Sequence, residues 1–355
     1  MKIFYAFNGQ GYGHASRSSV VIQYLESLGH DIRIATGEQG LVFARQAGRK
    51  NVFAIEQFKI HYSRQGASAM KTVFRFFQQS PKKLFVNTFK FHRALKGLQP
   101  DLVISDMEPF SYSWARWREL PLWTINNQSL ITLTKFSTPT RLLTDYFGAK
   151  TVVNLVNPLA DFNFVLSFCP HLTPLRAKYK KKSFLTPPIL RKEIFSLTPK
   201  TGNYVLIYQT NSAYHKKIKT IVNHFPQIKF YIYNLKNDGK FGRQAIFRKF
   251  SHTQLLEDLA GARAVIVNGG FTLLSEAIYL KKPIISLPMH GDFEQLLNAI
   301  LLDRANYGIF LKKIDLKKID SFFNNLDFYE RNLQEYHQNK NCLFETKLKE
   351  VLSFK

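Results

Sequence analysis

Cysteine is nearly absent from this 355-residue chain, which contains only Cys169 and Cys342. Two cysteines exclude a disulfide framework, supply too few thiols for a structural zinc site, and agree with a reducing cytosol. Long apolar runs are missing as well, because no stretch approaches the roughly 20 apolar residues that a membrane-spanning helix needs. The apolar run at 2–7 breaks at Asn8 and Gly9 with no cleavage pattern behind it, so we expect a buried strand there and no signal peptide.

Acidic residues are scarce relative to basic ones. The chain has 25 Asp and Glu against 50 Lys and Arg, which gives a formal net charge of +25. Such an excess draws a protein toward anionic membranes, nucleic acids or polyphosphate ligands, and charge alone does not choose among them. The hydrophobic fraction of 45% is ordinary for a folded protein, and the length favours two domains over one.

Short apolar runs alternate with helical stretches, which is typical of an α/β fold. Residues 2–7 and 31–35 read as strands around a glycine-rich loop at 8–15 and a helix at 17–28. A further helix is predicted around 112–118. Further strands are predicted at 101–105, 122–125, 204–208, 229–233, 264–267 and 284–287.

The alternation of predicted strands and helices stops where prolines cluster among basic residues. We therefore expect an N-terminal domain at 1–170, a linker at 171–201, a second α/β domain at 202–330 and a terminal helix at 331–355.

Residues 264–300 carry the polar pattern that says most about function. The strand at 264–267 ends in Asn268-Gly269-Gly270, and the strand at 284–287 is followed by a helix with further polar residues. In open α/β sheets, ligands bind outside the carboxyl ends of the strands, where glycines allow close approach and helix N-termini offer N–H groups to phosphate. The segment therefore predicts a diphosphate-binding site.

With Gly11-Tyr12-Gly13-His14 after the first strand and this second-half series, the chain resembles GT-B glycosyltransferases, in particular the MurG-like and UDP-glycosyltransferase families. The resemblance covers most of the chain and implies two Rossmann-like domains that face each other across a cleft. It also implies inverting, metal-independent transfer from a UDP-sugar, with no cofactor besides that donor. No DxD metal motif lies beside a suitable strand.

The resemblance assigns the nucleotide sugar to the second half of the chain. Glu276 would accept hydrogen bonds from both ribose hydroxyls, and Glu294 and Gln295 would contact the sugar hydroxyls. At 209–212 the family's glycine-rich loop is replaced by Gln-Thr-Asn-Ser. The backbone at 250–251 would read the uracil ring. The implied donor-binding residues are Gly11, Gly13, Asn211, Ser212, Phe250, Ser251, Asn268, Gly269, Gly270, Phe271, Glu276, Glu294, Gln295 and Asn298.

His14 would act as the general base, because histidine can take up a proton near neutral pH. Asp106, at the end of the strand at 101–105, lies where UDP-glycosyltransferases of small molecules place a carboxylate that orients such a histidine. The residues alone leave a second interpretation open, in which the glycine loop is an ordinary tight turn and Asp106 caps the helix that follows Pro109.

Interpretations without a role in ligand binding also remain open for three residues of the donor site. Glu276 could be a solvated helix residue, and Glu294 and Asn298, which share a helix face, could be surface or capping residues.

Residues 70–96 interleave phenylalanines with cations. The mixture predicts contact with an anionic membrane surface. The open alternative is that the aromatic rings pack into the first domain while the cations stay solvated. The residues are Phe74, Phe76, Phe77, Phe85, Phe89 and Phe91, with Lys71, Arg75, Lys82, Lys83, Lys90 and Arg93.

The sequence thus predicts a cytoplasmic glycosyltransferase, peripheral at the inner face of the membrane, that uses a nucleotide-sugar donor and a lipid or cell-envelope glycan acceptor. Two alternatives remain: a nucleotide-sugar hydrolase or epimerase of the same fold, and a nucleic-acid-binding protein that kept the fold without catalysis. We do not expect nucleic acid as a partner, because the basic residues are scattered and no recognised motif is present.

Overall fold

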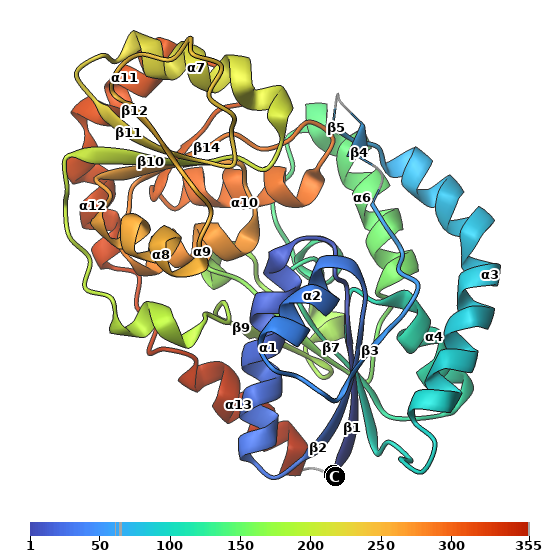
Figure 1. The fold of residues 1–355 in the computed structure, drawn as a ribbon. Coiled ribbons are helices and arrows are strands. Elements are labelled where there is room, and N and C mark those ends of the chain that lie inside the picture. Colours follow the sequence, from blue (N-terminus) through green and yellow to red (C-terminus); the bar gives the residue numbers. More distant parts are fainter. Residues whose placement is uncertain (61, 64–65, 354–355) are drawn as a thin grey trace. The chain divides into compact units, whose positions relative to one another are not determined.

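The computed structural model describes residues 1–60, 62–63 and 66–353 and divides into two compact units (Figure 1). The first unit comprises Met1–Tyr62, Ala67–Arg191 and Lys340–Lys355, and the second contains Lys192–Asn339. Each unit is built on its own parallel sheet with helices around it, which confirms the predicted pair of Rossmann-like domains.

The first unit contains a seven-stranded sheet in the order β3-β2-β1-β6-β7-β8-β9, and every described pair in it is parallel. Parallel strands covered on both faces appear in sequence as continuous apolar runs, which is why β1 and β6 were recognisable. The strands are β1 (Lys2–Phe7), β2 (Asp31–Thr36), β3 (Val52–Ala54), β6 (Leu102–Asp106), β7 (Leu122–Asn126), β8 (Phe162–Leu166) and β9 (Ser183–Thr186). Two short strands, β4 (Tyr62–Ser63) and β5 (Gly66–Ala67), pair with each other.

The strand order has one point of reversal. From β1 the chain moves outward to β3, then returns to place β6 on the other side of β1 and moves outward again to β9. The carboxyl ends of β1 and β6 therefore lie side by side with their loops leaving in opposite directions, which is where open α/β sheets bind ligands. The helices are α1 (Tyr12–Ser27), α2 (Glu38–Gln46), α3 (Ala69–Ala94), α4 (Pro109–Trp117), α5 (Leu130–Leu133), α6 (Leu143–Val156) and α13 (Cys342–Ser353), with 3-10 turns at Thr140–Leu142, Pro170–Leu172 and Ala177–Tyr179.

The second unit repeats this plan in a six-stranded parallel sheet ordered β12-β11-β10-β13-β14-β15. Its point of reversal lies between β10 and β13. The strands are β10 (Tyr204–Tyr208), β11 (Lys229–Tyr233), β12 (Ala245–Arg248), β13 (Ala264–Val267), β14 (Ile284–Ser286) and β15 (Gly308–Phe310). The helices are α7 (His215–His224), α8 (His252–Gly261), α9 (Phe271–Tyr279), α10 (Phe293–Arg304), α11 (Leu316–Asn324) and α12 (Leu326–Gln334), with 3-10 turns at Lys192–Ser196 and Ser212–Tyr214.

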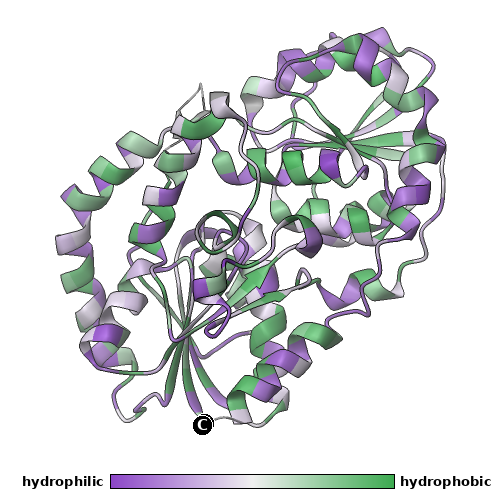
Figure 2. Ribbon diagram, turned by 180° about the vertical axis from the view of Figure 1, so that it is seen from behind, coloured by the Kyte–Doolittle hydropathy of each residue, from purple (hydrophilic) through white to green (hydrophobic). Residues whose placement is uncertain are grey.

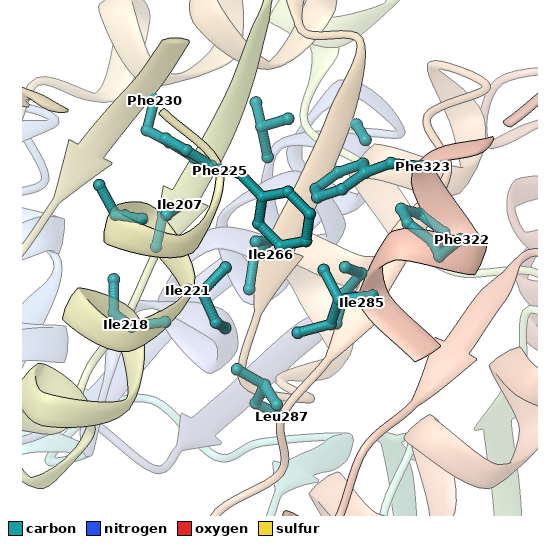
Figure 3. Packing of buried hydrophobic residues seen from close by; sticks show 14 of the residues in the cluster. Ile207, Ile218, Ile221, Phe225, Phe230, Ile266, Ile285, Leu287, Phe322 and Phe323 are labelled. Carbon is teal, nitrogen blue, oxygen red and sulfur yellow. The ribbon is translucent and has the colours of Figure 1, made fainter. Parts of the chain in front are cut away.

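One face of the second sheet is covered by α7 and α11 (Figure 3). Ile207, Ile266 and Ile285 project from three neighbouring strands toward Phe225 and Phe322, and all of these side chains are buried. Each fully buried side chain of this size contributes roughly 1.5–3 kcal/mol by removal from water. This packing fixes the strands whose ends carry the polar loops.

The structure differs from the sequence-based expectation at the boundaries. The expected linker at 171–201 contains β9, which pairs with β8 and so belongs to the first sheet. The polar C-terminal segment is two helices, since α12 ends at Gln334 and α13 begins at Cys342. The second of these belongs to the first unit, where Tyr24 Oη donates to the Glu345 carbonyl at 3.2 Å.

Candidate active site

Glycine builds the turn after β1. A Cβ atom on Gly9 would lie 1.8 Å from the carbonyl oxygen of Gly37, so no larger residue fits. Gly11 has a φ of 84°, in the left-handed region, and immediately precedes α1. The loop is consequently shorter than the predicted 8–15. Gly13 and His14 lie in the first turn of α1, so His14 is held by a helix and not by a flexible loop.

Asp106 ends β6 and is fully buried next to this turn. The Asn8 N–H donates to the Asp106 carbonyl at 2.9 Å, and Asn8 Nδ2 donates to the Met107 carbonyl at 3.4 Å, so the turns after the two central strands are joined. Nδ1 of His14 lies 2.9 Å from Oδ1 of Asp106. The fold therefore brings together the two residues that the sequence singled out for acid–base chemistry.

The carboxylate that caps α4 is Glu108 and not Asp106. Glu108 accepts hydrogen bonds from the N–H groups of Phe110 at 3.2 Å and Ser111 at 2.6 Å. Burial raises the pKa of Glu108 to about 7, although these hydrogen bonds oppose the shift. The capping interpretation of Asp106 is thereby excluded, and its carboxylate faces α1.

Arg17, which the sequence reasoning missed, completes the cluster. It is only 4% exposed. Its Nε donates to Asp106 Oδ2 at 2.7 Å and its Nη2 donates to Oδ1 at 2.6 Å, a bidentate ion pair, while Nη1 donates to Asn127 Oδ1 at 2.8 Å. A signal was present in the sequence, because residues 14 and 17 are three apart and share a helix face.

The cluster fixes the charge of Asp106. Burial by itself would raise the pKa of Asp106, but the charges and hydrogen bonds of Arg17 and His14 outweigh it and lower that pKa to about 2. The carboxylate is therefore ionised at neutral pH. An ionised carboxylate at Nδ1 can orient the imidazole and leave Nε2 for a substrate proton.

In the second unit, Asn268 joins the loops at the point of reversal between β10 and β13. Its Oδ1 accepts from the Thr210 N–H at 2.9 Å, and its Nδ2 donates to Oε1 of Gln209 at 2.7 Å. The Nε2 group of Gln209 is buried and has no hydrogen-bond partner among the described residues. This unused donor beside the glycine loop is a feature that the sequence reasoning did not single out.

Helix α10 holds the glycine loop in place. Nδ2 of Asn298 donates to the Gly269 carbonyl at 2.9 Å, and a Cβ on Gly269 would lie 2.6 Å from the carbonyl oxygen of Gln295. Asp292 caps this helix by accepting from the Gln295 N–H at 3.1 Å. Asn298 is therefore neither a surface residue nor the cap, whereas Glu294 lies half-buried in the first turn.

Glu276 lies in α9 with no exposed surface, which excludes the solvated-helix interpretation. The same helix begins at Phe271, directly after Gly270, so its first N–H groups follow the glycine loop. Among the described residues, no group of three or more His, Cys, Asp or Glu side chains is arranged to hold a metal ion.

The remaining predicted donor residues lie on loops of the second unit. Ser251 caps α8 by accepting from the Gln254 N–H at 3.4 Å. The Phe250 ring lies 6.4 Å from that of Tyr208, at the end of β10. Asn211 Nδ2 lies 3.7 Å from the sulfur of a methionine in the loop after β14. The side chain of Ser212 is outside the described part of the chain.

Helix α3 shows how the segment at 70–96 divides between the two interpretations. Phe91 is buried in the first unit, so part of the aromatic content is core. Four other rings and one methionine are exposed, with Phe74 at 68% and Phe85 at 79%. Spacings of three, four and eight residues place them along one face. We call this set the α3 stripe: Met70, Phe74, Phe77, Phe85 and Phe89.

Cations accompany the α3 stripe. Lys71, Arg75, Lys82 and Arg93 are exposed on the same helix. By contrast, the Lys83 ammonium donates to the Gln57 carbonyl at 2.7 Å within the first unit. Figure 2 shows hydrophobic and hydrophilic residues interleaved along α3, which lies beside α4 and α6 in Figure 1. No helix in the described part of the chain has the length and apolarity to span a bilayer.

Comparison with known proteins decides the family. The model for glycosyl transferase family 1 matches residues 1–327 of the chain. The chain belongs to this family. It is therefore a glycosyltransferase, in agreement with the two-sheet fold.

Curated relatives are similar over most of their length. A protein of Methanosarcina acetivorans, described as an uncharacterized glycosyltransferase, is 23% identical over 328 residues, which cover 87% of this chain and 85% of the relative. A protein of Methanosarcina mazei with the same description is 23% identical over 347 residues, with the same shares covered.

Solved structures share the fold at low sequence identity. The glycotransferase of kitacinnamycin is 14% identical with a TM-score of 0.68, covering 98% of both chains. CalG4, the calicheamicin glycosyltransferase, is 15% identical with a TM-score of 0.68, covering 99% of this chain and 98% of its own. The spinosyn rhamnosyltransferase SpnG, solved with thymidine diphosphate, is 13% identical with a TM-score of 0.63, covering 95% of both chains.

The lowered pKa of Asp106 predicts a specific acid sensitivity. Because the folded-state pKa of about 2 lies below the ordinary 3.8, the unfolded chain takes up the proton first as the pH falls. The stabilisation is therefore fully present above about pH 4 and is lost toward pH 2. Urea unfolding should show the parent losing about 2 kcal/mol more than Asp106→Asn between about pH 6 and pH 2. Parallel losses in the two proteins would contradict the assignment.

Proposed function

We propose that this glycosyltransferase transfers a sugar from a UDP-sugar to a lipid or cell-envelope acceptor, with inversion and without a metal ion. The observation that carries the proposal is the pairing of His14 with Asp106 at 2.9 Å, at the point of reversal of the first sheet. A histidine held by a buried, ionised carboxylate is suited to accept a proton from an attacking hydroxyl.

In the proposed reaction, the acceptor oxygen forms a bond to the anomeric carbon while the bond from that carbon to the diphosphate oxygen breaks. The hydroxyl proton passes to Nε2 of His14, and the bonding electron pair leaves with UDP. Asp106 stabilises the imidazolium that forms. One displacement from the face opposite the leaving group inverts the anomeric centre.

The second unit supplies groups suited to a nucleoside diphosphate. The glycine loop at 268–270 precedes the N-terminus of α9, whose free N–H groups favour phosphate oxygens, and the unused Nε2 donor of Gln209 is adjacent. These donors would stabilise the charge of the departing diphosphate in place of a metal. The carboxylate of Glu276 is the group proposed for the ribose diol.

The α3 stripe supports a lipid-borne acceptor. Large exposed apolar sets are uncommon on proteins that remain free in water. Exposed cations beside the stripe match an anionic bilayer, where each contributes about 1 kcal/mol of attraction. The helix would lie in the plane of the interface with its rings in the acyl boundary. This geometry would keep the first unit next to an acceptor that stays in the bilayer.

The donor proposal predicts nucleotide-selective stabilisation. UDP at about 100 times its Kd should add about 2.7 kcal/mol to the stability of the native state and raise Tm, and GDP and TDP should do less. EDTA should leave the shift unchanged. In the parent, 2′-deoxy-UDP should give a smaller shift than UDP, and Glu276→Gln should abolish that difference. A shift with TDP as large as that with UDP would contradict the donor assignment.

The base proposal predicts a loss in turnover with little change in donor binding. His14→Gln should lower kcat by about 10²–10⁴-fold while KM for the UDP-sugar changes little. His30→Gln is the matched control, because His30 contacts the N-terminal ammonium at 3.2 Å and lies beyond the end of α1. Steady-state kinetics with the sugar found by the nucleotide screen test this, and near-normal kcat in His14→Gln would refute the base.

The acceptor proposal predicts binding to anionic bilayers. The protein should sediment with vesicles of phosphatidylglycerol and phosphatidylcholine, and far less with phosphatidylcholine alone. Replacing Phe74, Phe77, Phe85 and Phe89 together by Gln should abolish binding without loss of folding, because these rings are exposed. Replacing Lys71, Arg75, Lys82 and Arg93 by Gln should remove the preference for the anionic lipid.

A double variant, Phe328→Gln with Leu343→Gln, serves as the control because it removes exposed apolar side chains on other helices. It should bind vesicles like the parent. If vesicle binding is unchanged after the four α3 phenylalanines are replaced, the α3 stripe is not the membrane-binding surface, whichever donor the protein uses.

A further inference from the structure

Three polar atoms meet at one point in the cluster of the first unit. Nδ1 of His14 lies 2.9 Å from Oδ1 of Asp106, and Nη2 of Arg17 lies 2.6 Å from both of these atoms. Asp106 is therefore shared between an imidazole and a guanidinium. A carboxylate that served the histidine alone would present its full charge to the ring, and this one does not.

Nδ1 of His14 is either a donor or an acceptor, so it can form a hydrogen bond with only one of its two neighbours at a time. If it carries a hydrogen it donates to the carboxylate, and if it carries a lone pair it accepts from the guanidinium. The guanidinium remains charged at every relevant pH. Its positive charge next to the ring opposes protonation of the imidazole, whereas the carboxylate favours protonation. The geometry thus places two opposite charges beside the imidazole of His14.

Arg17 is held rigidly, as this balance requires. Nη1 donates to Asn127 Oδ1 at 2.8 Å, and Nη2 lies 3.4 Å from Oε1 of Gln128. Both amides follow β7, the neighbour of β6, so a second strand end fixes the guanidinium. The side chain joins α1 to the ends of these two neighbouring strands.

Two hydroxyl groups also belong to the described part of the cluster. Ser18 Oγ donates to Asp106 Oδ2 at 3.3 Å, and Tyr5 Oη donates to that serine at 3.4 Å. Burial raises the pKa of Tyr5 far above its usual range, so the phenol from β1 stays neutral. The charged side chains facing His14 from α1 and β6 are thus Arg17 and Asp106 in the part of the chain described here.

We propose that Arg17 is a positioning residue that holds both carboxylate oxygens of Asp106 and offsets their charge beside the ring, so that His14 stays unprotonated at a lower pH than it would beside Asp106 alone. The inference rests on the proposed function only in taking His14 as the base. Its consequence for a transferase is a base that is available over a wider range of pH.

Titration of the imidazole by NMR tests this without any substrate. His14 is identified in the full chain by loss of its resonances in His14→Asn. Arg17→Gln should move the pH midpoint of the His14 resonances upward by about one unit or more, because the carboxylate is left without its counter-charge. Arg17→Lys, which keeps the charge but not the bidentate geometry, should move it much less. A midpoint in folded Arg17→Gln that is unchanged or lower overturns the proposal.

Two further variants separate charge from loss of structure. Asp106→Asn leaves the charge of Arg17 beside the ring without the carboxylate and should move the midpoint downward, so the sign of the effect remains testable if Arg17→Gln fails to fold. Arg33→Gln removes an arginine from the exposed ion pair with Asp31 and should leave the midpoint in place. An upward shift in Asp106→Asn would also overturn the proposal.

The activity arm distinguishes this inference from the proposed function. With an active donor and acceptor pair, Arg17→Gln should move the acidic limb of the kcat/KM profile to higher pH by the same amount as the NMR midpoint. If no nucleotide sugar is turned over but the NMR shifts appear, the proposed function fails and the role of Arg17 stands. If turnover depends on His14 but the NMR midpoint does not change in Arg17→Gln, the proposed function stands and the role of Arg17 fails.

Discussion

The parallel strand order on which each unit is built decides where its polar residues meet. A sheet that starts at its centre, moves to one edge and then returns to the centre must have two neighbouring strands whose loops depart in opposite directions. In the first unit these are β1 and β6; Asp106 ends β6, and His14 lies in the first turn of the helix that follows β1. In the second they are β10 and β13, and their ends hold Gln209 and Asn268. The strand order therefore decides where the polar side chains gather, and the contacts among these side chains set the geometry of the site.

Much of this arrangement could be predicted because buried parallel strands leave a clear sequence signal. The strands at 204–208, 229–233 and 264–267 have the predicted bounds. The pairing of residues 14 and 106 follows once residue 106 is assigned to the end of one central strand and residue 14 to the segment after the other. Short edge strands such as β3 and β15 carry too few apolar residues to stand out from loops. Strand β9 was hidden by the prolines around it.

Other features depend on three-dimensional context that local patterns do not contain. Arg17 looks like a surface cation in a sequence with 50 basic residues, and only the fold shows it buried against Asp106. The six phenylalanines of α3 look alike in sequence, yet one is core, one is partly buried against it and four are exposed, because the neighbouring helices cover only one side of α3. The sequence shows that aromatic and charged residues alternate, but it does not show which of these side chains are exposed to solvent.

The last helix has a consequence for how the protein is made. Phe344 on α13 is buried and packs 5.7 Å from Phe164 on β8, and Asn341 exchanges two hydrogen bonds with the backbone of Leu190. The first unit is thus closed by residues that a ribosome adds after the whole second unit. Domains generally fold as units, in order of synthesis. The contacts that α13 makes with the first sheet can therefore form only after residues 192–339 have been synthesised.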